Sequence, residues 1–95
     1  MIARLVLLAW LSASHSATLT WQWSANNVKA TAFSVQRGDN MAGPFHQIAT
    51  VPLTSLTYVD KAVKVRAKPY CYQVIALAKK GASSPPSNVA CAVIP

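Results

Sequence analysis

The side chains able to carry chemistry in this chain are few, and their types exclude most catalytic mechanisms. Among 95 residues there are nine Lys and Arg, two histidines and only two acidic residues, Asp39 and Asp60. Paired-carboxylate hydrolysis and oxygen-ligand metal sites therefore have almost no residues to draw on. No motif places a Ser or Cys nucleophile for His46, so we expect this side chain to be a solvated strand histidine. The sequence predicts no enzyme activity, no metal and no cofactor.

The two cysteines, Cys71 and Cys91, indicate a disulfide. They are twenty residues apart, with no CxxC motif and no second pair, which is the wrong spacing for a zinc site. In an oxidising compartment an even pair of cysteines indicates one disulfide. This agrees with export from the cytoplasm.

Residues 1–17 have the three-part layout of a secretory signal peptide. One positive charge precedes a seven-residue apolar block, and a tail of small residues follows it. Ser14 and Ser16 suit cleavage after Ser16, and the apolar block is much shorter than the ~20 residues that span a bilayer. We therefore expect a secreted, extracellular or periplasmic protein without a membrane span. The alternative is an N-terminal strand that is buried and never removed.

The rest of the chain alternates apolar and polar residues with a period of two. In the first such segment Leu19, Trp21 and Trp23 share one face, and no segment carries a helical stripe. Short strands with turns near every ten residues are typical of an all-β sandwich. The predicted strands are residues 18–24, 31–37, 45–51, 57–60, 70–78 and 88–94.

Six segments resemble, in order and spacing, the fibronectin type III domain, and most closely its versions in bacterial secreted proteins. They are Leu19–Trp21, Phe33–Arg37, Gly43–Phe45, Thr57–Asp60, Tyr70–Val74 and Pro86–Asn88. The resemblance covers residues 18–95 and implies an immunoglobulin-like Greek-key β-sandwich whose first strand is short or missing. It also implies a binding or adhesion module. Strand alternation and the resemblance give the same core: Trp21, Phe33, Val35, Tyr58, Tyr70, Tyr72, Val74 and Ala76.

The same pattern places the disulfide on the outer face of the sandwich. Alternation turns Tyr70 and Tyr72 inward and Cys71 outward, and the family pattern turns Cys91 outward on the last strand. These two strands are expected to be antiparallel neighbours joined by a turn at Gly81. We therefore predict a cross-strand bond between Cys71 and Cys91.

The tripeptide Arg37-Gly38-Asp39 matches the motif that integrins recognise in some fibronectin type III domains. In those domains the tripeptide lies on the hairpin between the last two strands, whereas here it follows residues 31–36. At this position Arg37 ends a strand and Gly38 begins a turn. We therefore favour a structural role over integrin binding.

Five basic residues are expected to gather at one end of the sandwich, and we call them the basic pole. Such a pole attracts polyanions such as acidic polysaccharide, although a solvated cationic rim that aids solubility is the favoured hypothesis. No motif or interleaved stacking aromatics indicate specific nucleic-acid binding. We expect Trp23 to pack in the core rather than form an exposed stacking platform. The basic pole consists of Arg37, Lys61, Lys64, Arg66 and Lys68.

A missing first strand would leave the backbone of Leu19–Trp23 open along one side. An open sheet edge invites strand addition from a partner. A retained N-terminus would instead place Ile2–Trp10 there as an edge strand, or set it apart as an apolar helix, which the signal-peptide hypothesis favours. We predict a non-catalytic secreted or periplasmic module that binds a protein or polysaccharide. The alternative is a virion or surface-layer assembly protein with a retained N-terminal arm.

Overall fold

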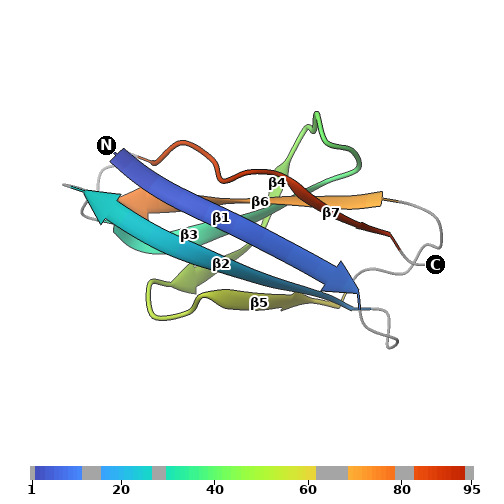
Figure 1. Ribbon diagram of the computed structural model, residues 1–95, viewed down its shortest axis with the longest axis horizontal. Helices are drawn as coiled ribbons and strands as arrows, with labels where there is room; N and C mark the ends of the chain where they lie inside the picture. The colour runs from blue at the N-terminus through green and yellow to red at the C-terminus, as the bar shows by residue number, and fades with distance from the viewer. Residues whose placement is uncertain (1, 12–15, 27–29, 62–68, 79–82, 94–95) are drawn as a thin grey trace.

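The protein consists of two antiparallel β-sheets that pack face to face (Figure 1). The computed structural model describes residues 2–11, 16–26, 30–61, 69–78 and 83–93, and these residues contain no helix that is long and apolar enough to span a membrane. The order is β1-β2-β5 in one sheet and β4-β3-β6-β7 in the other, which confirms the predicted all-β class. The strands are β1 (Ile2–Leu11), β2 (Ala17–Asn26), β3 (Ala30–Gly38), β4 (His46–Pro52), β5 (Thr57–Asp60), β6 (Pro69–Ala78) and β7 (Ala90–Val93).

The N-terminal apolar segment is an edge strand. β1 pairs with β2 along its whole length, from Ile2 opposite Asn26 to Leu11 opposite Ala17, and it lies beside β7 of the other sheet (Figure 1). The favoured prediction of a separate helix is therefore wrong, and so is that of a short or missing first strand. A run of apolar residues suits either element. The unpaired backbone groups of β2 decide the outcome, because pairing satisfies them.

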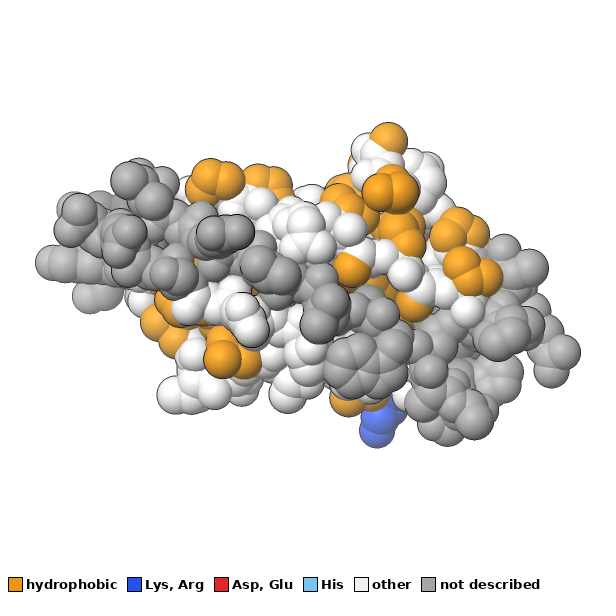
Figure 2. Space-filling view, viewed as in Figure 1, with side chains coloured by type: hydrophobic (Ala, Val, Ile, Leu, Met, Phe, Trp, Pro, Cys, Tyr) orange, Lys and Arg blue, Asp and Glu red, His pale blue; other side chains and the backbone are white. Residues whose placement is uncertain are grey.

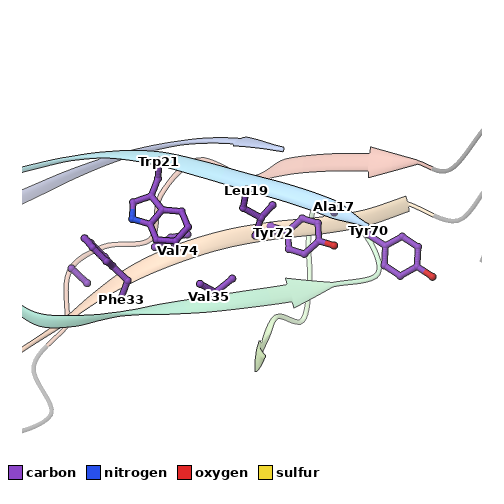
Figure 3. Packing of buried hydrophobic residues seen from close by; sticks show 9 residues of the cluster. Ala17, Leu19, Trp21, Phe33, Val35, Tyr70, Tyr72 and Val74 are labelled. Atoms are coloured by element: carbon purple, nitrogen blue, oxygen red, sulfur yellow. The ribbon is translucent and has the colours of Figure 1, made fainter. Parts of the chain in front are cut away.

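Apolar side chains from both sheets form the core between them. Leu19 and Trp21 point from β2 toward the β3 side chains (Figure 3). The rings of Trp21 and Trp23 both meet Phe33 edge to face, at 5.5 Å between centroids. Trp23 is partly buried against the core, as the core-packing hypothesis expected. The buried cluster comprises Ala17, Leu19, Trp21, Phe33, Val35, Tyr70, Tyr72, Val74 and Ala76, with Tyr58 partly buried against it.

The segment before β7 pairs with β6 through serine side chains instead of a regular ladder. The hydroxyl oxygens of Ser84 and Ser87 accept hydrogen bonds from the backbone N–H groups of Ala76 and Val74, at 2.9 and 2.8 Å. The backbone N–H groups of the same serines donate to the carbonyls of these two β6 residues. The two prolines between the serines have no N–H to donate. Regular pairing therefore begins only at Ala90, two residues later than predicted.

The predicted disulfide between Cys71 and Cys91 is confirmed. The two residues lie directly opposite each other in the β6–β7 pair, with an S–S distance of 2.09 Å and Cα atoms 4.0 Å apart. Cys91 is exposed, whereas Cys71 is 1% exposed and as buried as its neighbours Tyr70 and Tyr72. A disulfide is typical of compartments outside the cytoplasm. The predicted turn at Gly81 lies outside the described residues.

Deletion of residues 1–11 tests whether β1 is needed for folding. The truncated chain should lose its cooperative thermal transition, measured by circular dichroism and Trp fluorescence. The reason is that a domain has only about 5–15 kcal/mol of net stability, and the deletion opens the edge of β2. A synthetic peptide of residues 2–11 added in trans is the control and should restore the transition. An unchanged thermal midpoint in the truncated chain would show that β1 contributes nothing.

Candidate functional site

A buried carboxylate joins the two sheets at one end of the sandwich. Oδ2 of Asp60, the last residue of β5, accepts a hydrogen bond from Nη1 of Arg37 and another from the Tyr72 hydroxyl, each at 2.7 Å. Arg37 and Tyr72 lie opposite each other on β3 and β6 of the other sheet. One carboxylate of the first sheet is thus held by two donors of the second.

The electrostatics of this cluster keep both donors protonated. The Asp60 side chain is 5% exposed and the Arg37 side chain 29%, so the carboxylate depends on protein donors more than on water. Burial raises the pKa of Tyr72 far above its usual range, and the hydrogen bond to Asp60 and its charge raise it further. Burial alone would lower the pKa of Arg37, but the hydrogen bond and charge of Asp60 outweigh it and the net shift is upward.

A cavity of about 200 Å³ lies beside this cluster, between the end of β3 and the start of β4. Arg37 forms one wall, and His46, which lies opposite it in the β3–β4 pair, forms another. Among the described residues, Asp60 is the only hydrogen-bond partner of the Arg37 guanidinium, which carries five N–H donors. The full lining is Arg37, Gly38, Asp39, Pro44, His46 and Ile48.

The loop from β3 to β4 folds tightly back under Phe45. A Cβ atom on Gly38 would lie 2.8 Å from the carbonyl oxygen of Pro44 and 3.2 Å from the Phe45 ring. Gly43 has φ of +77°, a conformation that other L-residues rarely adopt, and its N–H donates to the Asn40 carbonyl at 3.1 Å. These two positions therefore require glycine, and Gly38 also lines the cavity.

The structure describes all three residues of the predicted integrin-type motif, Arg37, Gly38 and Asp39, and two members of the basic pole, Arg37 and Lys61. Arg37 is bonded to Asp60, whereas Asp39 is exposed on the loop and Lys61 is exposed just after β5. On the face shown in Figure 2, basic side chains of the described residues appear only at the lower margin. The other members of the basic pole lie outside the described residues: Lys64, Arg66 and Lys68.

His46 is an exposed residue at the start of β4 and lines the cavity. In the parts of the chain that the structure describes, no group of three or more His, Cys, Asp or Glu side chains could hold a metal ion. The arrangement offers a fixed cation, an imidazole and a carboxylate around a small space. Such a set can bind a polar ligand through hydrogen bonds.

Sequence reasoning missed the role of Asp60. The residue was noticed as part of Thr57–Asp60, a segment that resembles a known family, and not as the anchor of Arg37. The sequence did hold one signal. Asp60 is one of only two acidic residues in a chain with nine Lys and Arg, and it stands at the end of a predicted strand, where a basic partner could be expected. Ile48 and Pro44, which complete the cavity, gave no chemical signal at all.

No family model matches the chain. A curated relative, the amylopullulanase of Thermoanaerobacter thermohydrosulfuricus, is 36% identical over 64 residues, which are 67% of this chain and 4% of the relative. Among solved structures, pectate lyase Pel3 from Pectobacterium carotovorum has a TM-score of 0.72 at 21% identity, covering 93% of this chain and 26% of that one. A β-1,2-glucanase from Parabacteroides distasonis has a TM-score of 0.75 at 15% identity, covering 98% and 13%.

These comparisons establish similarity of fold. The chain spans about a quarter or less of each of these proteins, with shares of 4%, 26% and 13%. The glucanase match covers 98% of this chain, so the alignment extends into the N-terminal segment that forms β1.

Replacing Arg37 by Ala tests how much the ion pair stabilises the fold. The variant leaves the Asp60 carboxylate buried without its arginine partner, and we expect the free energy of unfolding to fall by about 2–4 kcal/mol. The exposed neighbour Lys61→Ala is the control and should change it by less than about 0.5 kcal/mol. Urea unfolding measures both values. Equal effects of the two substitutions would contradict a stabilising role for the ion pair.

Tyr72 should make stability fall in alkaline solution. The pKa of Tyr72 is raised in the folded state. The stability that this protonated side chain contributes is therefore fully present below about pH 10, the pKa of tyrosine in the unfolded chain. It is lost progressively as the pH rises above that value. The slope from this group approaches about 1.4 kcal/mol per pH unit. Urea unfolding of the wild type and of Tyr72→Phe between about pH 8 and 11, a range that brackets the ordinary pKa of tyrosine, should give a shallower fall of stability with pH for the variant. Identical slopes would show that Tyr72 ionises as easily in the folded chain as in the unfolded one.

Proposed function

We propose that this chain is a non-catalytic, fibronectin type III-like module of an exported protein and that it binds polysaccharide. The observation that carries the proposal is the share that the chain matches in three similar proteins, each named for acting on a polysaccharide. The part similar to this chain makes up 26% of the pectate lyase chain and 13% of the β-1,2-glucanase chain. The matching segment of the amylopullulanase makes up 4% of that protein. In proteins named for acting on polysaccharides, this fold is thus a minor part of the chain.

The architecture supports the fibronectin type III assignment. Seven strands divided into sheets of three and four are what an immunoglobulin-like Greek-key sandwich requires. The segments that carry the resemblance also occupy central positions. Trp21 of β2 and Tyr70 and Tyr72 of β6 are all buried in the core.

The inventory of polar residues supports a role without catalysis. Asp60 is buried in hydrogen bonds to Arg37 and Tyr72, where its carboxylate oxygen joins the sheets. Asp39 is the one other acidic residue in the sequence, so a pair of catalytic carboxylates is not available. A module of this kind acts by holding a ligand.

The charge of the chain supports an acidic ligand. The formal net charge is +7, and a cationic surface raises the local concentration of polyanions. Pectate, named in the pectate lyase, is an acidic polysaccharide, whereas the glucanase is named for a neutral one. The disulfide between Cys71 and Cys91 supports a location outside the cytoplasm.

A second candidate is a structural or assembly protein that retains its N-terminal segment. The observation that favours it is β1 itself, because Ile2–Leu11 pairs along the whole of β2. In the structure this segment occupies the Leu19–Trp23 edge at which strand addition from a partner was predicted. The intact mass of the exported protein separates the hypotheses. Loss of residues 1–16 supports a cleaved signal peptide, and a mass that includes them supports a retained strand.

Affinity electrophoresis through gels that contain polygalacturonate or amylopectin tests polysaccharide binding. We expect retardation by polygalacturonate at low salt that fades near ~0.5 M salt, because the Debye length falls well below 10 Å. A variant with Lys61, Lys64, Arg66 and Lys68 all changed to Gln is the charge control and should migrate with less retardation. Absence of retardation in both gels, or release of new reducing ends, would overturn the proposal.

A further inference from the structure

The cavity between β3 and β4 is the right size for one small chemical group. Its volume of about 200 Å³ lies below the ~300 Å³ at which pockets for drug-sized ligands begin. It is bounded by strand ends and by a loop that Gly38 and Gly43 hold in a tight conformation. A site of this size and rigidity suits a single ring of a larger ligand.

Arg37 is held in place for ligand binding by groups behind it. One Nη atom donates to Asp60, and Asp60 is itself fixed by the Tyr72 hydroxyl, both at 2.7 Å. The remaining N–H donors of the guanidinium have no partner among the described residues, and Arg37 lines the cavity. A planar guanidinium matches the two oxygens of a carboxylate. Support from behind reduces the cost of ordering this side chain when a ligand binds.

The other walls of the cavity select against a simple inorganic anion. Asp39 lines the cavity and brings a negative charge that opposes a simple anion, and His46 offers ring nitrogens that can pair with hydroxyl groups. Pro44 and Ile48 contribute apolar surface. One fixed cation, polar groups suited to hydroxyls and an apolar wall together fit a hydroxyl-rich ring that carries one carboxylate.

We propose that this cavity binds one uronate ring of an acidic polysaccharide, with Arg37 contacting the carboxylate and Asp60 and Tyr72 positioning Arg37. The inference rests on the proposed polysaccharide-binding function and names its ligand class and contact residue. Arg37 also belongs to the basic pole, but that pole is expected to act through the summed charge of its five members. Here a single arginine supplies the contact and the cavity supplies the selectivity.

NMR titration of the full chain tests the inference at the level of single residues. The probes are digalacturonate, its methyl ester as the neutral counterpart, and acetate as a carboxylate without a ring. We expect saturable shifts of the Gly38, His46 and Ile48 amides with digalacturonate, and weaker effects with each of the other two. Equal effects of the acid and its ester, or shifts confined to residues outside the cavity, would overturn the inference.

Variants separate binding from folding. Arg37→Lys keeps a charge beside Asp60 but loses the planar fork, so we expect digalacturonate affinity to fall about tenfold or more. His46→Ala should also weaken binding, because His46 is exposed and its loss leaves the core intact. Thr50→Ala is the matched control, since Thr50 is an exposed residue of β4 outside the cavity lining. Unchanged affinity in Arg37→Lys would overturn the role of Arg37.

The two proposals fail in different ways. If polygalacturonate gels retard the protein but digalacturonate does not shift the amide signals of the cavity residues, the polysaccharide-binding proposal is supported and the uronate subsite is overturned. Cavity shifts with digalacturonate without retardation in any gel would support the subsite and overturn the polysaccharide-binding module. Loss of both signals would overturn both.

Discussion

The Asp60 carboxylate is the constraint on which one end of this molecule depends. An unpaired buried carboxylate costs several kcal/mol, so β5 can bring Asp60 to this position only if the opposite sheet presents donors. Arg37 and Tyr72 do so from neighbouring strands, at 2.7 Å each. Because hydrogen bonds are directional, they fix how the two sheets meet at this end. The same bonds set the position of the Arg37 guanidinium and thereby one wall of the cavity.

The rest of the sandwich is held by apolar packing between the sheets and by hydrogen bonds within one sheet. Apolar packing between the sheets stabilises through buried area and tolerates small displacements. The outer face of the larger sheet adds a polar chain in which Gln73 donates to Gln36 at 2.7 Å and Gln36 to Ser34 at 3.4 Å. Ser34 in turn donates to Gln47 at 2.7 Å. These bonds connect three strands of one sheet, whereas the Asp60 cluster connects the two sheets.

Alternation of residue types predicted most of the fold but little of the site. Period-two patterns located the strands from Leu19 onward, and alternation together with the family resemblance identified Cys71 as the partner of Cys91. For β1 the sequence offered an edge strand only as the less favoured alternative, because its apolar run has no alternation to distinguish a strand from a helix or a leader. The Arg37–Asp60 pair escaped because its partners lie in different sheets. Their approach depends on how the sheets stack, which no local pattern encodes.

The position of β1 also determines where a ligand can bind. With β1 paired along β2, the edge at Leu19–Trp23 is occupied by the chain's own backbone, so recognition by strand addition is closed there. The proposed function relies on side chains instead. In the part of the chain that the structure describes, Arg37 lines the cavity, is held by Asp60 and has guanidinium N–H groups that no described residue accepts from. A single exposed lysine in water forms only weak charge interactions. A guanidinium held by Asp60 would meet a uronate carboxylate already oriented, which is the argument for placing the proposed subsite at this end of the sandwich.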